Sequence, residues 1–207
     1  MRKITSIGTA LFAFFLVTSG LNAATEIELQ PANNDPDDNQ SLQRGARNFM
    51  NYCSGCHSAK YVRFSTIGRD LEISEKQMIE NLMFNADKTF DTIQVTMPME
   101  DSVRWFGTSP PDMSLIARSR GVDYIYNFLK GFYLDPGSPT GVDNRVLAGT
   151  SMPHILWELQ GYQNAIFSID EDGVRHLDRF EAVTAGTMST DQYDDFVRDT
   201  VNFLAYI

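Results

Sequence analysis

Apolar residues recur every three or four positions in several stretches of the chain, a spacing that is typical of helices with one buried face. The clearest stretch lies at the C-terminal end, where Ser189 and Gln192 form a capping box that starts a helix. The apolar face of this helix holds Tyr193, Phe196, Val197, Thr200, Val201 and Leu204. A second helix, predicted from near Ser41, runs into a pair of cysteines and carries on one face Leu42, Ala46, Phe49 and Tyr52.

Four shorter helices are predicted between these two. Ser74 and Gln77 form another capping box at the start of one of them. Its expected apolar face consists of Ile79, Leu82 and Met83. The other three are expected from Asp112, as a cap, to Gly121, over residues 123–133, and over residues 154–159 with Gly161 as the stop.

Irregular segments separate these helices. Residues 86–111 contain two junctions of methionine with proline and the Pro110–Pro111 pair, and residues 134–153 are rich in Gly, Pro and Asp. Apolar and polar residues alternate over residues 165–183 around the turn residues 171–173, which predicts a β-hairpin. The pattern as a whole favours a mainly helical domain with long loops and a small hairpin.

The N-terminal residues have the layout of a secretory signal peptide. Arg2 and Lys3 precede an apolar stretch over residues 10–17, and small and polar residues follow. We therefore expect a signal peptide over 1–24, an acidic, proline-broken arm over 25–40 and the folded domain over 41–207. An uncleaved membrane anchor is the alternative, although the apolar stretch is short for a span.

Charge narrows the choice of partners. The 207 residues include 17 Lys and Arg against 27 Asp and Glu, a formal charge of -10, and 43% are hydrophobic, as in a globular protein. Removal of the signal peptide takes away two basic residues and no acid, which leaves -12. An acidic chain is unsuited to a phosphate backbone, so we expect no nucleic acid as partner. A basic protein partner would be attracted over long range.

The chemistry is concentrated in Cys53–Ser54–Gly55–Cys56–His57, the CxxCH signature of c-type haem attachment. Two thiols at this spacing can each form a thioether with one haem vinyl group, and the adjacent imidazole can bind the iron. A redox dithiol would be expected within a βαβ pattern, which is not predicted here. A zinc site would need two further ligands, and a disulfide across so small a loop would stabilise little.

The sixth ligand of the iron could be a methionine or a second histidine, or the position could be open. Met50, Met78 and Met83 lie in predicted helices and are expected to fill the core. The methionines in loops are Met97, Met152 and Met188. Met97 and Met152 each precede a proline that fixes the backbone, so the residues alone do not separate these two.

Several separated segments resemble the cytochrome c1 family. They are SLQRGARNFMNYCSGCHSAKYVRF around the cysteines, SPPDMSLIARSRG followed by DYIYNFLKGFY, PTGVDNRVLAGTSMPHILWELQG, GTMSTDQYDDFVRDTVNFLAYI at the end, and EIELQP in the arm. The resemblance covers nearly all of residues 25–207, with the motifs in the family's order and in a short form similar to the proteobacterial members. It implies a mainly α, class I cytochrome c-like haem domain.

The resemblance also assigns roles to particular residues. It implies one covalent haem c bound by Cys53, Cys56 and the proximal ligand His57. It favours Met152 over Met97 as the axial methionine, and it places Arg118 at a haem propionate. The residues that would shield the haem face are Trp105, Pro110 and Pro111.

The implied function is one-electron transfer by a subunit of the cytochrome bc1 complex, rather than catalysis by the chain alone. The family takes electrons from the Rieske iron–sulfur protein, assembles with cytochrome b and reduces a soluble cytochrome c, which would be basic here. The expected location is the periplasmic side of the bacterial inner membrane. The family continues into a C-terminal membrane helix, whereas this sequence ends at Ile207. The alternatives are a free periplasmic electron shuttle and a haem enzyme with an open iron site.

Overall fold

The computed structural model describes residues 28–207, so the predicted signal peptide and the first residues of the arm lie outside the described part. Its helices are α1 (Asn39–Tyr52), α2 (Phe64–Asp70), α3 (Glu75–Asn81), α4 (Met99–Phe106), α5 (Ile116–Arg120), α6 (Val122–Lys130), α7 (Trp157–Gln160) and α8 (Thr190–Tyr206). Its strands are β1 (Ala59–Arg63), β2 (Thr92–Ile93), β3 (Phe132–Leu134), β4 (Val142–Asn144), β5 (Gly161–Ile169) and β6 (Arg175–Ala185). Over these residues, no helix combines the length and the apolar character needed to cross a membrane.

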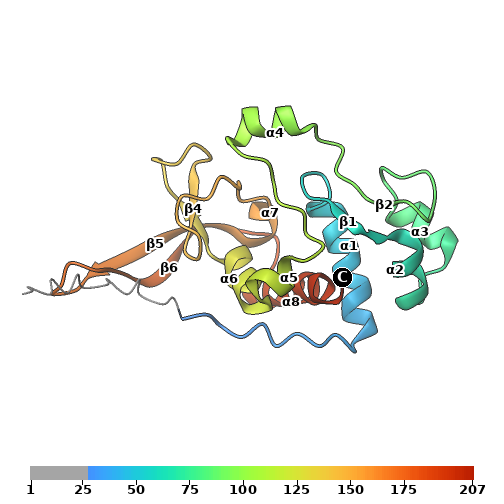
Figure 1. The fold of residues 1–207 in the computed structure, drawn as a ribbon. Coiled ribbons are helices and arrows are strands. Elements are labelled where there is room, and N and C mark those ends of the chain that lie inside the picture. The colour runs from blue at the N-terminus through green and yellow to red at the C-terminus, as the bar shows by residue number, and fades with distance from the viewer. Residues whose placement is uncertain (1–27) are drawn as a thin grey trace, which may run out of the picture.

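Helices dominate the architecture, and α1, α5, α6 and α8 gather at its centre (Figure 1). The strands form three antiparallel pairs, β1–β2, β3–β4 and β5–β6. The β5–β6 hairpin extends away from the helices, while α4 stands apart above the centre (Figure 1). The mainly α class with a small hairpin is therefore confirmed.

The first and last helices cross at very short distance. A Cβ atom at Gly45 of α1 would lie 2.0 Å from the main-chain oxygen of Asp199 and 2.7 Å from Cβ of Phe203, both on α8. Beside this point, the fully buried rings of Phe49 and Phe203 pack with centroids 5.8 Å apart. Glycine is thus required at position 45 because only a backbone without a Cβ allows the two helices to meet this closely.

Polar contacts between α1 and α8 also stabilise this crossing. The Arg44 guanidinium donates to both carboxylate oxygens of Asp199, with Nε–Oδ2 and Nη2–Oδ1 distances of 2.6 and 2.9 Å. Ser41 Oγ donates to the same carboxylate over 2.7 Å. The hydrogen bonds to Asp199, more than its charge alone, raise the pKa of Arg44. Because Asp199 is buried, removing either donor would leave a costly unpaired acceptor.

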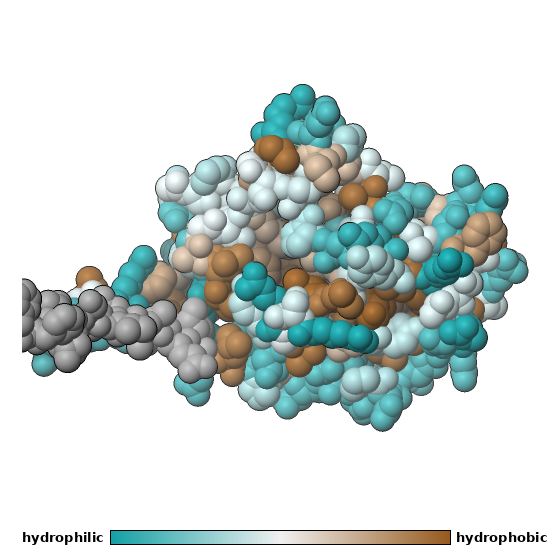
Figure 2. All heavy atoms as spheres, in the orientation of Figure 1, coloured by the Kyte–Doolittle hydropathy of each residue, from teal (hydrophilic) through white to brown (hydrophobic). Residues whose placement is uncertain are grey.

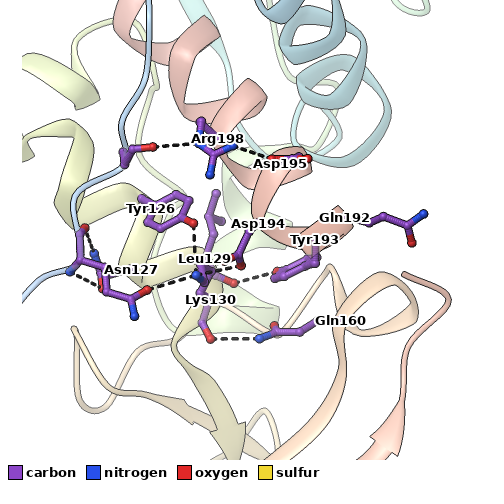
Figure 3. Close-up of polar contacts among 12 residues, drawn as sticks. Tyr126, Asn127, Leu129, Lys130, Gln160, Gln192, Tyr193, Asp194, Asp195 and Arg198 are labelled. Atoms are coloured by element: carbon purple, nitrogen blue, oxygen red, sulfur yellow. Dashed lines mark hydrogen bonds and ion pairs between the residues drawn. The ribbon is translucent and has the colours of Figure 1, made fainter. Parts of the chain in front are cut away.

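The N-terminal arm lies along α6 and α8 and is held there by hydrogen bonds (Figure 3). The main chain of Gln30 accepts from and donates to the Asn127 side chain over 2.7 and 3.1 Å. Arg198 Nε donates to the carbonyl of Ala32 over 3.1 Å, and the Ala32 side chain is fully buried. Asp38, at the end of the arm, caps α1 by accepting from the main chain of Ser41. The described part of the arm is therefore packed against the domain.

Both predicted capping boxes are confirmed, at Ser74 with Gln77 and at Ser189 with Gln192. The hairpin prediction is also confirmed by β5 and β6. The apolar face assigned to α3 was partly wrong, because Ile79 is 53% exposed whereas Met78 beside it is 1% exposed. A helix of two turns offers too few positions for its own pattern to fix which side meets the core.

Several element predictions need correction. The segments 86–111 and 134–153 are not irregular throughout, since the first contains β2 and α4 and the second contains β4. Asp112 does not cap α5: its carboxylate accepts from the main chain of Lys60 and of Ser114. The helix expected over 123–133 ends at Lys130: the Gly131 amide donates to the Phe128 carbonyl over 3.2 Å, and the chain then enters β3.

Replacing Gly45 by alanine should destabilise the domain by about 1–3 kcal/mol or more, because the new Cβ would clash with main-chain atoms that cannot move independently. Gly55→Ala is the control, since a Cβ there meets nothing within 4 Å. Chemical denaturation of both variants measures the difference. Equal stability of the two variants would contradict the close crossing.

Candidate functional site

A cavity of about 410 Å³ opens between α1, α8, α6 and the loops that follow α4 and β4. Most of its lining is apolar, with Phe49, Phe128 and Leu129 among the side chains that form its walls. Figure 2 shows hydrophobic side chains gathered across the middle of the molecule between more hydrophilic margins. A deep apolar slot of this kind suits a large flat hydrophobic ligand.

The CxxCH residues reach this cavity through one further turn after α1. The main-chain amide of Cys53 donates to the Phe49 carbonyl, and that of His57 donates to the Cys53 carbonyl, each over 2.9 Å. Cys53, Cys56 and His57 consequently all line the cavity. The predicted attachment residues are therefore brought together at one wall.

Both cysteines are free thiols and are partly buried. Burial raises the pKa of Cys53 to about 12, and burial also raises the pKa of Cys56. A redox dithiol needs a lowered thiol pKa, so these thiols are unsuited to that role. Among residues 28–207, no group of three or more His, Cys, Asp or Glu side chains is arranged to hold a metal ion.

His57 is held in the state that a metal ligand requires. Its Nδ1 lies 2.8 Å from the carbonyl oxygen of Pro111, and a carbonyl only accepts, so Nδ1 carries the proton. The lone pair is then on Nε2. Burial lowers the pKa of His57, which favours the neutral imidazole. A fixed tautomer with a free Nε2 is the usual arrangement of a histidine that binds iron.

The proline segment, defined here as residues 109–114, is tied down beside His57. The Met113 amide donates to the Ser58 carbonyl over 2.7 Å, and the Tyr61 amide donates to Ser114 Oγ over 3.1 Å. Pro110 and Pro111 line the cavity as expected. Trp105 does not line it and is 58% exposed, whereas the next residue, Phe106, does.

Met152 lines the cavity, and Met97 and Met188 do not. Met113, which the sequence reasoning missed, also lines it. The main chain of Met113 is bonded to Ser58, next to His57, so it belongs to the histidine side of the cavity. Met152 comes from a separate segment between Gly149, which has a φ of 72°, and Pro153. Met50, Met78 and Met83 are buried core residues, as expected.

The structure does not bring Arg118 to the cavity. Arg120, two residues later in the same motif, is the only Arg, Lys, Asp or Glu among the lining residues in the described part of the chain. Its guanidinium lies 5.6 Å from the ring centroid of Tyr124, which also lines the cavity. The sequence signal that could have pointed to Arg120 is the glycine after it. Arg120 is the last residue of α5, and Gly121 then turns the chain.

His154 lies outside the cavity lining although it follows Met152 by two residues. Its ring is buried and stacks on Phe132, with centroids 5.0 Å apart and an interplanar angle of 11°. Burial lowers the pKa of His154 to about 4. This placement disfavours His154 as an iron ligand.

Comparison with known proteins identifies the family. The sequence profile of the cytochrome c1 family matches residues 34–162. Cytochrome c1 of Allochromatium vinosum is 41% identical over 208 aligned residues, which span the whole chain and 84% of that protein. The chain belongs to the cytochrome c1 family. A protein described as the ammonia monooxygenase gamma subunit of Nitrosomonas europaea is 36% identical and is matched over 83% of its length.

A more distant relative places the family in an assembly. The cytochrome b–c1 complex catalytic subunit of Candida albicans mitochondria is 31% identical over 123 residues, which are 51% of this chain and 42% of that protein. Membership of the cytochrome c1 family supports haem-based electron transfer in the bc1 complex as the function. The cavity fits that cofactor, because it combines an apolar slot with two thiols, a neutral imidazole and a methionine.

The buried histidine gives a pH prediction. The unfolded chain protonates His154 near its usual pKa of 6.5, whereas the folded protein resists protonation until about pH 4. The stability that follows is complete above pH 6.5 and is lost as the pH falls toward 4, by about 3 kcal/mol. Unfolding free energies of wild type and His154→Phe between pH 7 and 4 should diverge for this reason. Parallel curves would mean that protonation of carboxylates alone causes the loss of stability at low pH.

Proposed function

We propose that this chain carries one covalent haem c and passes single electrons from the Rieske iron–sulfur protein to a soluble cytochrome c within the bc1 complex. The observation that carries the proposal is that Cys53, Cys56, His57 and Met152 all line one apolar cavity. The bound haem supplies reversible one-electron exchange at its iron. The protein residues have to hold it, fix its ligands and exclude water.

Cys53 and Cys56 attach the haem by thioether bonds, and His57 binds the iron through Nε2. The bond between His57 Nδ1 and the Pro111 carbonyl keeps the imidazole in one orientation and makes it a stronger donor. Met152 is the second axial ligand. Met113 also lines the cavity, but its main chain is bonded to Ser58 beside His57, which favours Met152 for this role.

Filling both axial positions determines the chemistry of the site. Ligation by a thioether and an imidazole would raise the reduction potential of the haem. A raised potential suits a haem that accepts electrons within a quinol-oxidising complex. It also leaves no open position for a substrate, which disfavours the alternative of a haem enzyme. The apolar walls around Phe49 and Phe128 exclude water from the iron.

Arg120 is the residue that we assign to a haem propionate, in place of Arg118. A guanidinium can bind a carboxylate through two parallel hydrogen bonds. Arg120 is the cationic side chain of the cavity lining, and its position over Tyr124 restricts the direction of the group. Arg118 is not among the residues that line the cavity.

We also propose the partners of this chain and its location in the cell. Cytochrome b and the Rieske protein are the partners within the complex, and the haem domain lies on the periplasmic side of the bacterial inner membrane. Export depends on the signal peptide proposed over 1–24. The net charge of -12 without that segment supports a basic cytochrome c as the acceptor. The acidic residues Asp35, Asp37 and Asp38 are candidate contacts for this acceptor.

Covalent attachment predicts that the haem remains on the denatured chain. Haem-stained peroxidase activity should stay with the protein on a denaturing gel, and acidified acetone should not extract the haem. The double variant Cys53→Ala with Cys56→Ala should lose the stain, since no thioether can form. Extraction of the haem from the wild-type protein would contradict the proposal.

Met152→Leu should fold, because the two side chains have similar volumes and the exchange usually costs less than about 1.5 kcal/mol. The oxidised variant should nevertheless lose the near-infrared band of methionine-ligated haem, and its reduction potential should fall. Met97→Leu is the matched control, since it also precedes a proline but lies outside the cavity. Loss of the band in Met97→Leu but not in Met152→Leu would disprove the assignment.

The proposed acceptor predicts a dependence on salt. Electron transfer from the reduced protein to a basic cytochrome c should slow as ionic strength rises, because salt screens the attraction. Transfer to ferricyanide, a small anion, should speed up under the same conditions. A rate to the basic cytochrome that stays flat up to physiological salt would remove the acidic surface from the mechanism.

A further inference from the structure

The methionine segment, residues 149–156, has few main-chain ties to the rest of the domain. In the described structure, the main-chain donors of residues 152–156 bond locally: the Met152 amide donates to Thr150 Oγ1 over 3.3 Å and the Ile155 amide to the Pro153 carbonyl over 2.9 Å. The Trp157 amide donates to the His154 carbonyl at the start of α7. The position of Met152 therefore depends on side-chain packing.

His154 provides that packing on the side away from the cavity. It is 6% exposed, and its ring lies flat against Phe132. The ring of Tyr162 meets it edge-on, with centroids 6.2 Å apart and an interplanar angle of 77°. Among the described residues, neither ring nitrogen has a partner at regular hydrogen-bond geometry, although the Gly161 main chain and the Gln160 side chain lie near the ring. Aromatic contact is therefore the main support of this side chain.

The surface that receives His154 is itself rigid. Phe132 begins β3, which pairs with β4, and Gln163 Nε2 donates to the Phe132 carbonyl over 2.8 Å. Gln160 Nε2 at the end of α7 donates to the Lys130 carbonyl over 3.0 Å (Figure 3). β3 and α7, which lie on either side of His154, are thus both held near the end of α6.

The aromatic contacts continue to the cavity wall. Phe132 packs edge-on against Phe128, with centroids 5.2 Å apart, and Phe128 lines the cavity. His154 is therefore one side chain through which the methionine segment contacts the same wall that the haem would touch. A shift of this ring would move Met152, only two residues away, relative to that wall.

We propose that His154 is a positioning residue for Met152, and that its stacking on Phe132 keeps the thioether directed into the cavity. The proposal rests on the role of Met152 as axial ligand. His154 makes no contact with the haem in this reading. Its effect is to lower the population of molecules in which the methionine has left the iron.

Competition by added imidazole measures that population at neutral pH. In the oxidised holoprotein, His154→Ala should bind imidazole about ten-fold or more tightly, equivalent to ~1.4 kcal/mol of lost methionine ligation. His154→Phe restores a flat ring on Phe132 and should bind imidazole within about two-fold of wild type, the range of a small packing change. Unchanged imidazole affinity in His154→Ala would overturn the proposal.

A control separates positioning from general destabilisation. Leu71→Ala opens a cavity in the core at the end of α2, where Leu71 is fully buried. This variant should lose stability without gaining imidazole affinity. An equal gain in Leu71→Ala would show that any weakened core releases the methionine, and would overturn the proposal.

Tyr162→Ala tests the positioning role of His154 if His154→Ala fails to fold. It removes the edge contact from the other side of His154, and Tyr162 is only half-buried, so the fold should survive. We expect a smaller gain in imidazole affinity in the same direction, and no gain would overturn the proposal. A wild-type protein without the near-infrared band would instead show that the methionine ligand itself was wrongly proposed.

Discussion

The close crossing of α1 and α8 is the constraint on which the haem site depends. Because Gly45 has no side chain, the two helices approach until the rings of Phe49 and Phe203 touch, and the Arg44–Asp199 pair closes the rim of the contact. The CxxCH residues follow directly after α1. Their position relative to the cavity walls on α8 is therefore set by the packing of the two ends of the chain, about 150 residues apart in sequence.

Local sequence signals were sufficient to predict much of this fold. The capping boxes at Ser74 and Ser189 combine a side-chain acceptor and donor at fixed spacing, so they need no tertiary information. The same holds for CxxCH, whose residues are linked by the turn that follows α1. Signals of this kind predicted one wall of the site and the starts of α3 and α8.

Tertiary contacts decided what the sequence could not. The choice between Arg118 and Arg120 depends on how α5 is rotated against the cavity, and a helix of five residues carries no pattern strong enough to fix that rotation. Met97 and Met152 have the same local context before a proline. The family resemblance separated them in favour of the one that lines the cavity, which the residues alone had not done.

The two sides of the cavity are held in different ways. On the histidine side, main-chain and side-chain hydrogen bonds join the proline segment to residues 57–61, so His57 can move little without breaking several of them. On the methionine side, aromatic packing around His154 replaces such bonds. Hydrogen bonds fix direction more strictly than stacked rings do. In the proposed site, a rigid proximal ligand, His57, is therefore combined with a distal ligand, Met152, whose retention depends on the quality of core packing.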